Sequence, residues 1–409
     1  MNPAFECRSC GVRHHELILD LGHQPLANNL LCPGDLHKPE PRFPLRLFVC
    51  PGCWLVQITD LVPPVELFSE YLYFSSFSEA MLQHARNAAG RYTVEFGLDK
   101  ESLVIEIASN DGYLLKNFVA TQIPCLGIEP AANIASVARD QGIETLGEFF
   151  GESLARKLAA ECRVADLILG NNVFAHAPDP NDFVAGLRTL LKPGGRIVLE
   201  FPYAVEMIAQ CEFDTIYHEH VFYFTLTSLQ PLFRRHGLDV LHVEQLPIHG
   251  GSLRIFAGHA GRHPTHASVA ALQAEETRQG VATPHYYAGF ARRVAATKRA
   301  LCDLIDRLKH QGKTIAAYGA SAKGSTLLNF FGLGNAEIEF VADRSPYKQG
   351  RLTPGTHLPI VPAEELVIRM PDYTLLLTWN FADEILRQQA DYRQRGGKFI
   401  LPIPEVKIV

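Results

Sequence analysis

Short apolar runs alternate with segments of helical spacing through the middle of the chain. The runs lie at residues 103–107, 125–128, 165–170 and 196–201, and the first three lead through a turn into a helical segment. Strands that stay apolar along their length are typical of a parallel sheet covered by helices on both faces. Repeated β–α units of this kind predict a doubly wound domain, which we expect to cover residues 66–260.

The last third of the chain repeats this pattern on a smaller scale. A long helical segment at residues 287–311 precedes a strand, a glycine-containing turn and a helix within residues 313–331. Two further apolar runs complete a second Rossmann-like unit, expected to cover residues 285–409. Residues 262–285 show no sustained apolar period, so we expect an irregular connection there. The predicted fold class is α/β, with a larger central and a smaller C-terminal domain.

The first 65 residues differ from both units, because they are rich in proline and contain no long periodic segment. They carry two Cys-x-x-Cys pairs, formed by Cys7 with Cys10 and by Cys50 with Cys53. Each pair can place two thiolates on one tetrahedral ion, as structural zinc sites do. Four thiolate ligands leave no open coordination position, so we predict a structural zinc ion in an N-terminal module at residues 1–65.

Disulfide bonding is the main alternative for these thiols. The chain has nine cysteines, and an odd number cannot pair completely, so reduced thiols fit better. Chance clustering is a second alternative, which two close pairs among so few cysteines disfavour. Cys32 lies between the pairs, and we expect it to be a small buried residue rather than a fifth ligand.

Composition restricts the possible partners. Hydrophobic residues make up 47% and charged residues 20% of the chain, which suffices for ordinary buried cores. With 38 basic and 44 acidic side chains, the chain has a formal net charge of −6. It therefore lacks the overall positive charge that attracts nucleic acid without regard to sequence. Neither a secretory leader nor an uninterrupted apolar span is evident in the sequence. We expect a cytoplasmic protein, monomeric or weakly homo-oligomeric, that binds neither nucleic acid nor membrane.

Acidic residues end the first two central strands. Glu106 closes the first strand and Glu129 closes the second. An acid about 20 residues beyond the first turn commonly accepts two hydrogen bonds from a ribose diol, which fits NAD as well as S-adenosylmethionine. The pyrophosphate fingerprint Gly-x-Gly-x-x-Gly is missing, and the charge of Glu106 suits a methionine ammonium group. Together these features favour S-adenosylmethionine.

Four segments carry a resemblance to a known family. They are Glu106-Ile-Ala-Ser-Asn110-Asp111-Gly112-Tyr113-Leu114, Gly127-Ile-Glu129-Pro130, Asn171-Asn172-Val-Phe-Ala-His176 and Leu191-Lys-Pro-Gly-Gly195. In this order they resemble class I S-adenosylmethionine-dependent methyltransferases, although only Gly112 remains of the usual three glycines, with Ala108 and Asn110 at the other two positions. With the cysteine module and the second nucleotide unit, the whole chain resembles the zinc-containing C-3′-methyltransferases of thymidine-diphosphate keto-deoxysugars.

The resemblance implies a cofactor site at the carboxyl ends of the central strands. Its candidate residues are Tyr71, Glu106, Asn110, Asp111, Gly112, Glu129, Glu148, Phe149, Asn171 and Asn172. Some of them have plain structural alternatives. Asp111 can cap a helix, Glu148 can be a solvated loop acid, and the two asparagines can simply form a turn.

Ionisable residues cluster after the last of these strands, at Tyr217-His218-Glu219-His220. The two histidines lack the four-residue helical spacing of a metal site, which disfavours metal binding. Tyr217, Glu219 and His220 resemble the family's catalytic Tyr-x-Glu-His residues, with His218 at the variable position. Methylation of carbon requires a base that removes a proton next to the ketone.

The same resemblance suggests a role for each member of this cluster. We expect His220 to be the base, Glu219 to orient it or to touch the sugar, and Tyr217 to donate to the developing enolate oxygen. The alternative is that these residues only shape the pocket. In that case His249 is the next candidate for the base.

The C-terminal unit contains a candidate phosphate site. The turn Gly319-Ala-Ser321-Ala-Lys323-Gly324 leads into a helix, whose N-terminal backbone amides and dipole attract anions. The resemblance implies that this unit holds the nucleotide diphosphate of the sugar. The candidate substrate residues are Tyr73, His249, Gly319, Ser321, Lys323 and Asp343. The alternative is a unit that only completes the fold.

The predicted function is S-adenosylmethionine-dependent C-methylation of a nucleotide-diphosphate keto-deoxysugar at the carbon next to the ketone. The first alternative is a zinc-containing methyltransferase that acts on RNA, protein or another small molecule. A non-enzymatic nucleotide sensor and an NAD-dependent sugar epimerase are further alternatives. The epimerase is disfavoured because the chain lacks a Tyr-x-x-x-Lys pair after a suitable glycine turn.

Overall fold

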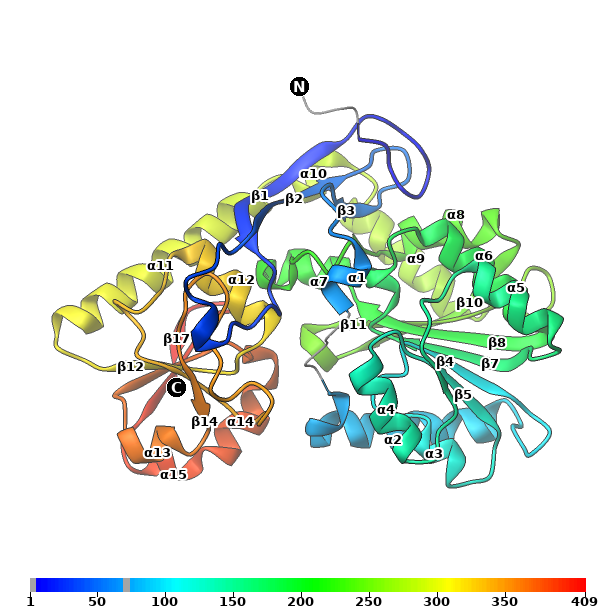
Figure 1. Ribbon diagram of the computed structural model, residues 1–409. Helices are drawn as coiled ribbons and strands as arrows, with labels where there is room; N and C mark the ends of the chain where they lie inside the picture. Colours follow the sequence, from blue (N-terminus) through cyan, green and yellow to red (C-terminus); the bar gives the residue numbers. More distant parts are fainter. Residues whose placement is uncertain (1–4, 69–73) are drawn as a thin grey trace.

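The computed structural model describes residues 5–68 and 74–409, apart from the side chains of Phe68 and His249, and contains three sheets (Figure 1). Figure 1 shows the C-terminal unit on the left, the central unit on the right, and the N-terminal strands lying across the top. This confirms the predicted α/β class with an N-terminal cysteine module and two Rossmann-like units. Among the described helices, none combines the length and the apolar composition that a bilayer span requires.

The N-terminal sheet has four antiparallel strands. They are β1 (Glu16–Pro25), β2 (Arg42–Val49), β3 (Val56–Ile58) and β9 (Phe222–Tyr223), in that order. Leu45, Leu47 and Val49 of β2 are buried in alternation, and this period of two was overlooked in the proline-rich sequence. The fourth strand comes from the central part of the chain, so the module is completed by residues far away in sequence.

The central sheet has seven strands in the order β10-β11-β8-β7-β4-β5-β6. The strands are β4 (Val104–Ile107), β5 (Cys125–Ile128), β6 (Thr145–Leu146), β7 (Ala165–Asn171), β8 (Leu191–Pro202), β10 (Leu238–Leu246) and β11 (Ser252–His259). The accompanying helices are α1 (Pro64–Phe68), α2 (Glu79–Glu95), α3 (Lys116–Val119), α4 (Ala132–Asp140), α5 (Glu152–Ala160), α6 (Pro180–Leu190), α7 (Ala204–Ala209) and α8 (Leu226–Arg235). Strands β4 to β8 are parallel, and β11 and β10 continue the sheet in antiparallel pairing. The carboxyl ends of the parallel strands therefore meet at one edge, as the sequence predicts.

The C-terminal sheet has six strands in the order β14-β13-β12-β15-β16-β17. The strands are β12 (Ile315–Tyr318), β13 (Val341–Asp343), β14 (Ile360–Pro362), β15 (Tyr373–Leu376), β16 (Lys398–Leu401) and β17 (Lys407–Ile408). The helices that follow the central sheet along the chain are α9 (Ala267–Gln279), α10 (Pro284–Tyr287), α11 (Phe290–His310), α12 (Ala322–Phe331), α13 (Glu365–Arg369), α14 (Ala382–Gln388) and α15 (Ala390–Gln394), of which α9 packs against β10 and α8 of the central unit. All strands are parallel except β17, which gives a second, smaller open sheet.

The expectation of an irregular connection at residues 262–285 is wrong, because this segment contains α9 and the start of α10. A buried carboxylate anchors α9: Glu276 accepts hydrogen bonds from the backbone amides of Leu226 and Thr227 and from the hydroxyl of Tyr203, each at 2.7 Å. These donors lie at the N-terminus of α8 and after β8. A tertiary contact thus stabilises this helix. Because the helix depends on that contact, its sequence shows little apolar periodicity.

The four cysteine sulfur atoms of the N-terminal module lie within 4.8 Å of one another. The Cys7 and Cys53 sulfurs are 3.6 Å apart, and those of Cys10 and Cys50 are 3.5 Å apart. Tetrahedral zinc with Zn–S bonds of about 2.3 Å requires sulfur separations slightly below 4 Å, so the cluster fits the ion. Cys32 lies outside the cluster and is exposed, which corrects the expectation of a buried residue.

We expect purified protein to contain about one equivalent of zinc per chain. Cys50→Ser should lose the ion and lower the melting temperature, because the free energy of metal binding supports the folded module. Cys32→Ser is the matched control and should keep both. Elemental analysis with thermal denaturation measures these outcomes, and zinc-free protein of normal stability would contradict the assignment.

Candidate active site

A cavity of about 760 Å³ lies where the three parts of the chain meet. The N-terminal part contributes Asn28, the central unit contributes Glu129, Asn171 and His220 among others, and the C-terminal unit contributes Ser321, Lys323, Asp343 and Lys348. Ligand cavities commonly measure about 300–1,000 Å³, so this one is at the large end of the range. Residues predicted to bind the cofactor, to act as the base and to bind phosphate therefore line the same cavity.

The turn after β4 has a backbone typical of glycine at three positions, although only one of them is a glycine. Ala108, Asn110 and Gly112 have φ angles of +53°, +50° and +79°. Left-handed φ is unfavourable for alanine and better tolerated by asparagine. At Gly112 a Cβ atom would lie 2.2 Å from the Ile143 side chain, so glycine is required there. Three residues of this turn, of which one is glycine, therefore adopt a left-handed backbone.

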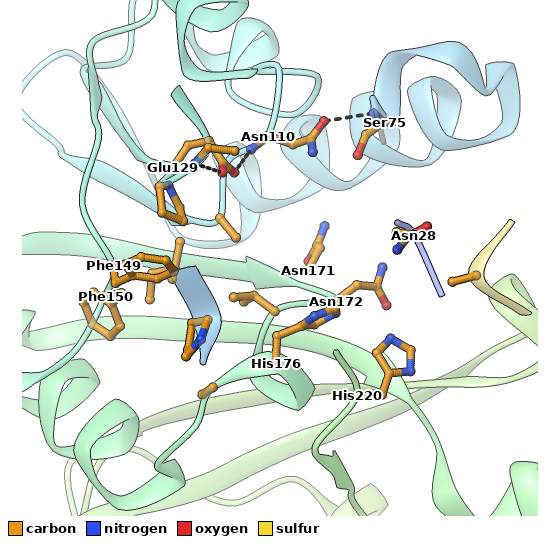
Figure 2. A pocket seen from close by; sticks show the side chains of 18 of the residues that line it. Asn28, Ser75, Asn110, Glu129, Phe149, Phe150, Asn171, Asn172, His176 and His220 are labelled. Atoms are coloured by element: carbon orange, nitrogen blue, oxygen red, sulfur yellow. Dashed lines mark hydrogen bonds between the residues drawn. The ribbon is translucent and has the colours of Figure 1, made fainter. Parts of the chain in front are cut away.

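Glu129 holds this turn from the end of β5 (Figure 2). Its carboxylate accepts hydrogen bonds from the backbone amides of Asn110 at 3.0 Å and Ala131 at 2.9 Å. Burial raises the pKa of Glu129, and the two amide bonds oppose that shift. A carboxylate can accept about four hydrogen bonds. Glu129 lines the cavity and retains acceptor positions for a ligand diol.

Two neighbouring side chains connect this turn to the segment before α2. The Asn110 side-chain oxygen accepts a hydrogen bond from the Ser75 backbone amide at 2.9 Å, and Asp111 accepts bonds from both the amide and the hydroxyl of Ser76. Asn110 lines the cavity, whereas Asp111 and Gly112 lie behind it. The candidates Tyr71 and Tyr73 lie outside the described residues.

Glu106 does not reach the cavity wall. It is fully buried, and neither carboxyl oxygen has a hydrogen-bond partner within the described part of the chain. Burial, together with the charges of Asp111 and Glu129, raises its pKa well above the usual value. An enclosed carboxyl group with a raised pKa is less suited to supply the negative charge expected beside a ligand ammonium group.

The remaining cofactor candidates line the cavity: Glu148, Phe149, Asn171 and Asn172. Glu148 forms an exposed ion pair with Lys157 at 3.1 Å, and the Phe149 ring is half exposed. Asn172 has a φ of +55°, and its backbone amide donates a hydrogen bond to the Glu200 carbonyl at 2.7 Å. Asn172 therefore also shapes the turn after β7. Figure 2 shows Phe149 on the same side of the pocket as Glu129.

Tyr217 and His220 both line the cavity and bond to each other. The His220 Nδ1 lies 2.9 Å from the Thr215 carbonyl oxygen, and the Nε2 lies 2.8 Å from the Tyr217 hydroxyl. Because a carbonyl only accepts hydrogen bonds, Nδ1–H donates to it, and Nε2 accepts the tyrosine proton. Thr215, rather than Glu219, therefore orients the imidazole.

The two residues between Tyr217 and His220 point elsewhere. Glu219 is buried and accepts a hydrogen bond of 2.6 Å from the Asn28 side-chain amide; burial raises its pKa to about 7. His218 Nε2 donates to the Pro44 carbonyl at 3.2 Å, against the N-terminal sheet. Neither side chain lines the cavity.

His176 and Asn28 are among the cavity residues that received no role from the sequence, as is Lys348. His176 lies with its ring centre 4.8 Å from that of His220, in a perpendicular arrangement, and removal from water lowers its pKa to about 4. It ends the motif that begins at Asn171, and this motif is the signal that could have identified it. Asn28 belongs to the N-terminal module and has no comparable motif.

The C-terminal wall is formed around the start of α12. The Ser321 hydroxyl accepts a hydrogen bond from the Gly324 amide at 3.1 Å and caps the helix. Lys323 Nζ lies 4.0 Å from the Glu212 carboxylate and 4.7 Å from the centre of the Trp379 ring. These contacts place the ammonium group at the cavity with a buried acid behind it.

Asp343 holds the turn before α12 and lines the same wall. Its carboxylate accepts hydrogen bonds from the amides of Ala320 at 2.7 Å and Ser345 at 2.8 Å. Gly319 shapes this turn with a φ of +93°, and a Cβ atom there would lie 2.5 Å from the Thr378 hydroxyl. Gly319 does not itself line the cavity, and the His249 side chain lies outside the described part of the chain.

Three family models match successive parts of the chain. Residues 7–68 match "Putative zinc binding domain", residues 81–243 match "Methyltransferase domain", and residues 247–404 match "C-methyltransferase C-terminal domain". The methyltransferase match confirms the predicted enzyme class and its cofactor, S-adenosylmethionine. The zinc-binding match covers all four clustered cysteines.

A full-length relative and two solved structures complete the comparison. C-methyltransferase NovU of Streptomyces niveus is 39% identical over 410 residues, which covers 100% of this chain and 98% of the relative. Magnesium protoporphyrin IX methyltransferase of Synechocystis PCC 6803, solved with bound S-adenosylmethionine, matches 44% of this chain and 79% of its own at 11% identity and a TM-score of 0.34. A chain from the complex of the Haloferax volcanii Trm112 activator with a methyltransferase matches 44% of this chain and 93% of its own at 14% identity and a TM-score of 0.36.

The identity over the full length and the three successive domain matches establish the family. The chain therefore belongs to the zinc-containing, S-adenosylmethionine-dependent C-methyltransferases, the family that includes NovU.

Proposed function

We propose that this protein methylates a carbon atom next to the ketone of a nucleotide-diphosphate keto-deoxysugar. The observation that carries the proposal is the position of the Tyr217–His220 pair in one cavity with Glu129 and with the start of α12. A base between a cofactor site and an anion site suits a substrate that has a charged tail and an acidic C–H bond. The motif resemblance supports a thymidine-linked deoxysugar as the substrate.

The cofactor binds at the Glu129 side of the cavity in this proposal. Glu129 accepts the ribose hydroxyl groups, the turn at Ala108 and Asn110 leaves room for the methionine portion, and Phe149 contacts the adenine ring. When bound, S-adenosylmethionine supplies the electrophilic methyl group. The open acceptor positions of Glu129 and the left-handed turn beside it are the structural features that fit this cofactor.

The substrate reacts at the His220 side. The Nε2 atom removes a proton from the carbon next to the ketone, and the electron pair of the broken C–H bond delocalises as an enolate. The Tyr217 hydroxyl moves its hydrogen bond from Nε2 to the enolate oxygen and stabilises the developing charge. The enolate carbon would then take up the methyl group as the bond between this group and the cofactor's sulfur breaks, with the thioether of S-adenosylhomocysteine as the leaving group. The imidazolium afterwards returns its proton to water.

The diphosphate binds at the start of α12. Helix N-termini carry unpaired amide groups and a partial positive charge, and Lys323 and Lys348 line the cavity beside this one. Lys348 Nζ donates to the Ala320 carbonyl at 2.8 Å, which keeps its charge close to the turn. Two ammonium groups at a helix N-terminus form a suitable site for a diphosphate.

For the cofactor, Glu129→Ala should weaken S-adenosylmethionine binding by about 1.5–3 kcal/mol, the range for hydrogen bonds to a charged group. Thymidine diphosphate should still bind, because its site lies in the other unit. Glu144→Ala, which removes an exposed acid from the same region, is the control and should change neither affinity. Calorimetry with each ligand tests this, and an equal loss of both would refute the two-site arrangement.

For the base, His220→Asn should lower turnover by about 10²–10⁴-fold and leave S-adenosylmethionine binding intact. It should also stop exchange of the acidic carbon-bound hydrogen in deuterated water. His218→Asn changes the neighbouring histidine that faces Pro44 and should retain both activities within a few-fold. Normal exchange in the His220 variant, followed by NMR, would place the base elsewhere.

For the diphosphate, Lys323→Ala should raise the dissociation constant of thymidine diphosphate and weaken its dependence on salt. Burial raises the pKa of Glu212 to about 7 even though Lys323 lowers it, so the variant should raise this pKa further. Lys100→Ala removes one exposed positive charge elsewhere and should leave binding unchanged. Titrations at several salt concentrations measure the difference, and equal behaviour of the two variants would count against the site.

A further inference from the structure

Asn28 is the residue of the N-terminal loop 26–31 that lines the cavity. Hydrogen bonds within the loop and to the C-terminal unit fix the position of this loop. The loop follows β1 and turns back through a hydrogen bond from the Asn29 amide to the Leu26 carbonyl at 3.1 Å. Leu31 then forms an antiparallel bridge with Leu352 of the C-terminal unit, through backbone hydrogen bonds of 3.0 and 2.8 Å. The backbone of Asn28 is therefore placed by two parts of the molecule.

The side chain of Asn28 is fixed by a buried acid. Its Nδ2 atom donates to Glu219 Oε2 at 2.6 Å. The Glu219 oxygen accepts this bond, so it keeps the amide nitrogen of Asn28 turned toward the buried acid. The carboxamide oxygen and the second N–H then remain for other partners, and Asn28 lines the cavity.

Glu219 is a buried carboxylate. Within residues 5–68 and 74–409 no lysine or arginine forms an ion pair with it. Burying a carboxylate without a counter-ion costs stability, and such groups are concentrated at functional sites. Because Glu219 lies behind the wall, Asn28 is the member of the pair that a ligand can meet.

The pair lies at the reactive side of the cavity. Figure 2 shows Asn28 on the side of Asn172 and His220, with Glu129 and Phe149 on the other side. A ligand that contacts Asn28 is therefore the molecule deprotonated by His220 rather than the adenosine part of the cofactor.

We propose that Asn28 is a substrate-binding residue supplied by the zinc-binding module, and that Glu219 is the positioning residue that holds its carboxamide. The inference rests on the proposed function, in which the ligand beside His220 is the sugar. The fixed carboxamide oxygen accepts a hydrogen bond from a sugar hydroxyl group. The zinc-binding module is thus part of the substrate site, in addition to its structural role.

The first test compares Asn28→Ala with Asn29→Ala, a change at the neighbouring exposed asparagine. With a thymidine-diphosphate keto-deoxysugar as the probe, Asn28→Ala should raise the KM for the sugar nucleotide roughly 3- to 10-fold, the loss expected for one hydrogen bond. The dissociation constant of S-adenosylmethionine and the zinc content should stay at wild-type values. Asn29→Ala should match the wild type throughout.

The second test is a double-mutant cycle between Asn28 and Glu219. If Glu219 acts through Asn28, Glu219→Ala should raise the same KM, and the double variant should be no worse than Asn28→Ala alone. Glu219→Gln keeps an acceptor oxygen for the Asn28 amide and should restore the KM to within about twofold. A merely structural role of Glu219 would instead change the melting temperature without this selective, non-additive effect on KM.

The possible results distinguish a failure of this inference from a failure of the proposed function. Wild-type turnover of the sugar nucleotide together with an unchanged KM in Asn28→Ala would overturn this inference and leave the proposed function intact. Additive effects in the cycle would overturn the positioning role of Glu219. A wild-type protein that neither binds nor methylates the sugar nucleotide would overturn the proposed function and this inference together.

Discussion

The pairing of β3 with β9 holds the segment that carries Tyr217 and His220. Val56 pairs with Tyr223 and Gln57 with Phe222, and the Ile58 amide donates to the Val221 carbonyl at 3.0 Å. Because β9 follows His220 within two residues, this short antiparallel contact sets the position of the imidazole. Gln57 also donates to the Cys7 sulfur at 3.1 Å, so the same strand connects the zinc cluster to the active site.

The C-terminal unit holds the other side of this segment. The Trp379 indole donates to the Asp214 carboxylate at 2.7 Å, and the Thr326 hydroxyl donates to the Ile216 carbonyl at 3.2 Å. The segment that bears Tyr217 and His220 is thus bonded to both flanking parts of the molecule, which explains why the cavity opens between them. Burial is the leading cause of the raised pKa values of several acids around it, among them Asp214 and Glu219. Keeping such groups away from water lowers stability, which is a common cost of a functional site.

Regular local patterns made most of the fold predictable, and their absence explains the exceptions. The apolar runs that became β4, β5 and β7 stand out because a parallel strand buries both faces. Helix α9 was overlooked because it depends on the buried Glu276 and its partners at α8, a contact between distant residues. The strands of the N-terminal module were overlooked for a related reason, since β9, which completes their sheet, lies far along the chain.

For the candidate active site, the sequence alone predicted the chemical types of the side chains and their approximate location. The cysteine pairs and the acid at the end of β5 have local spacing that indicates chemistry, and the Tyr-x-Glu-His cluster was identified by its resemblance to a known family. Only the tertiary structure decided which side chains face the cavity, turning His218 toward Pro44 and Glu106 into the core while bringing in Asn28. The physical reason is that side-chain direction in an irregular segment depends on hydrogen-bond partners from elsewhere in the chain, such as the Thr215 carbonyl for His220 and Glu219 for Asn28.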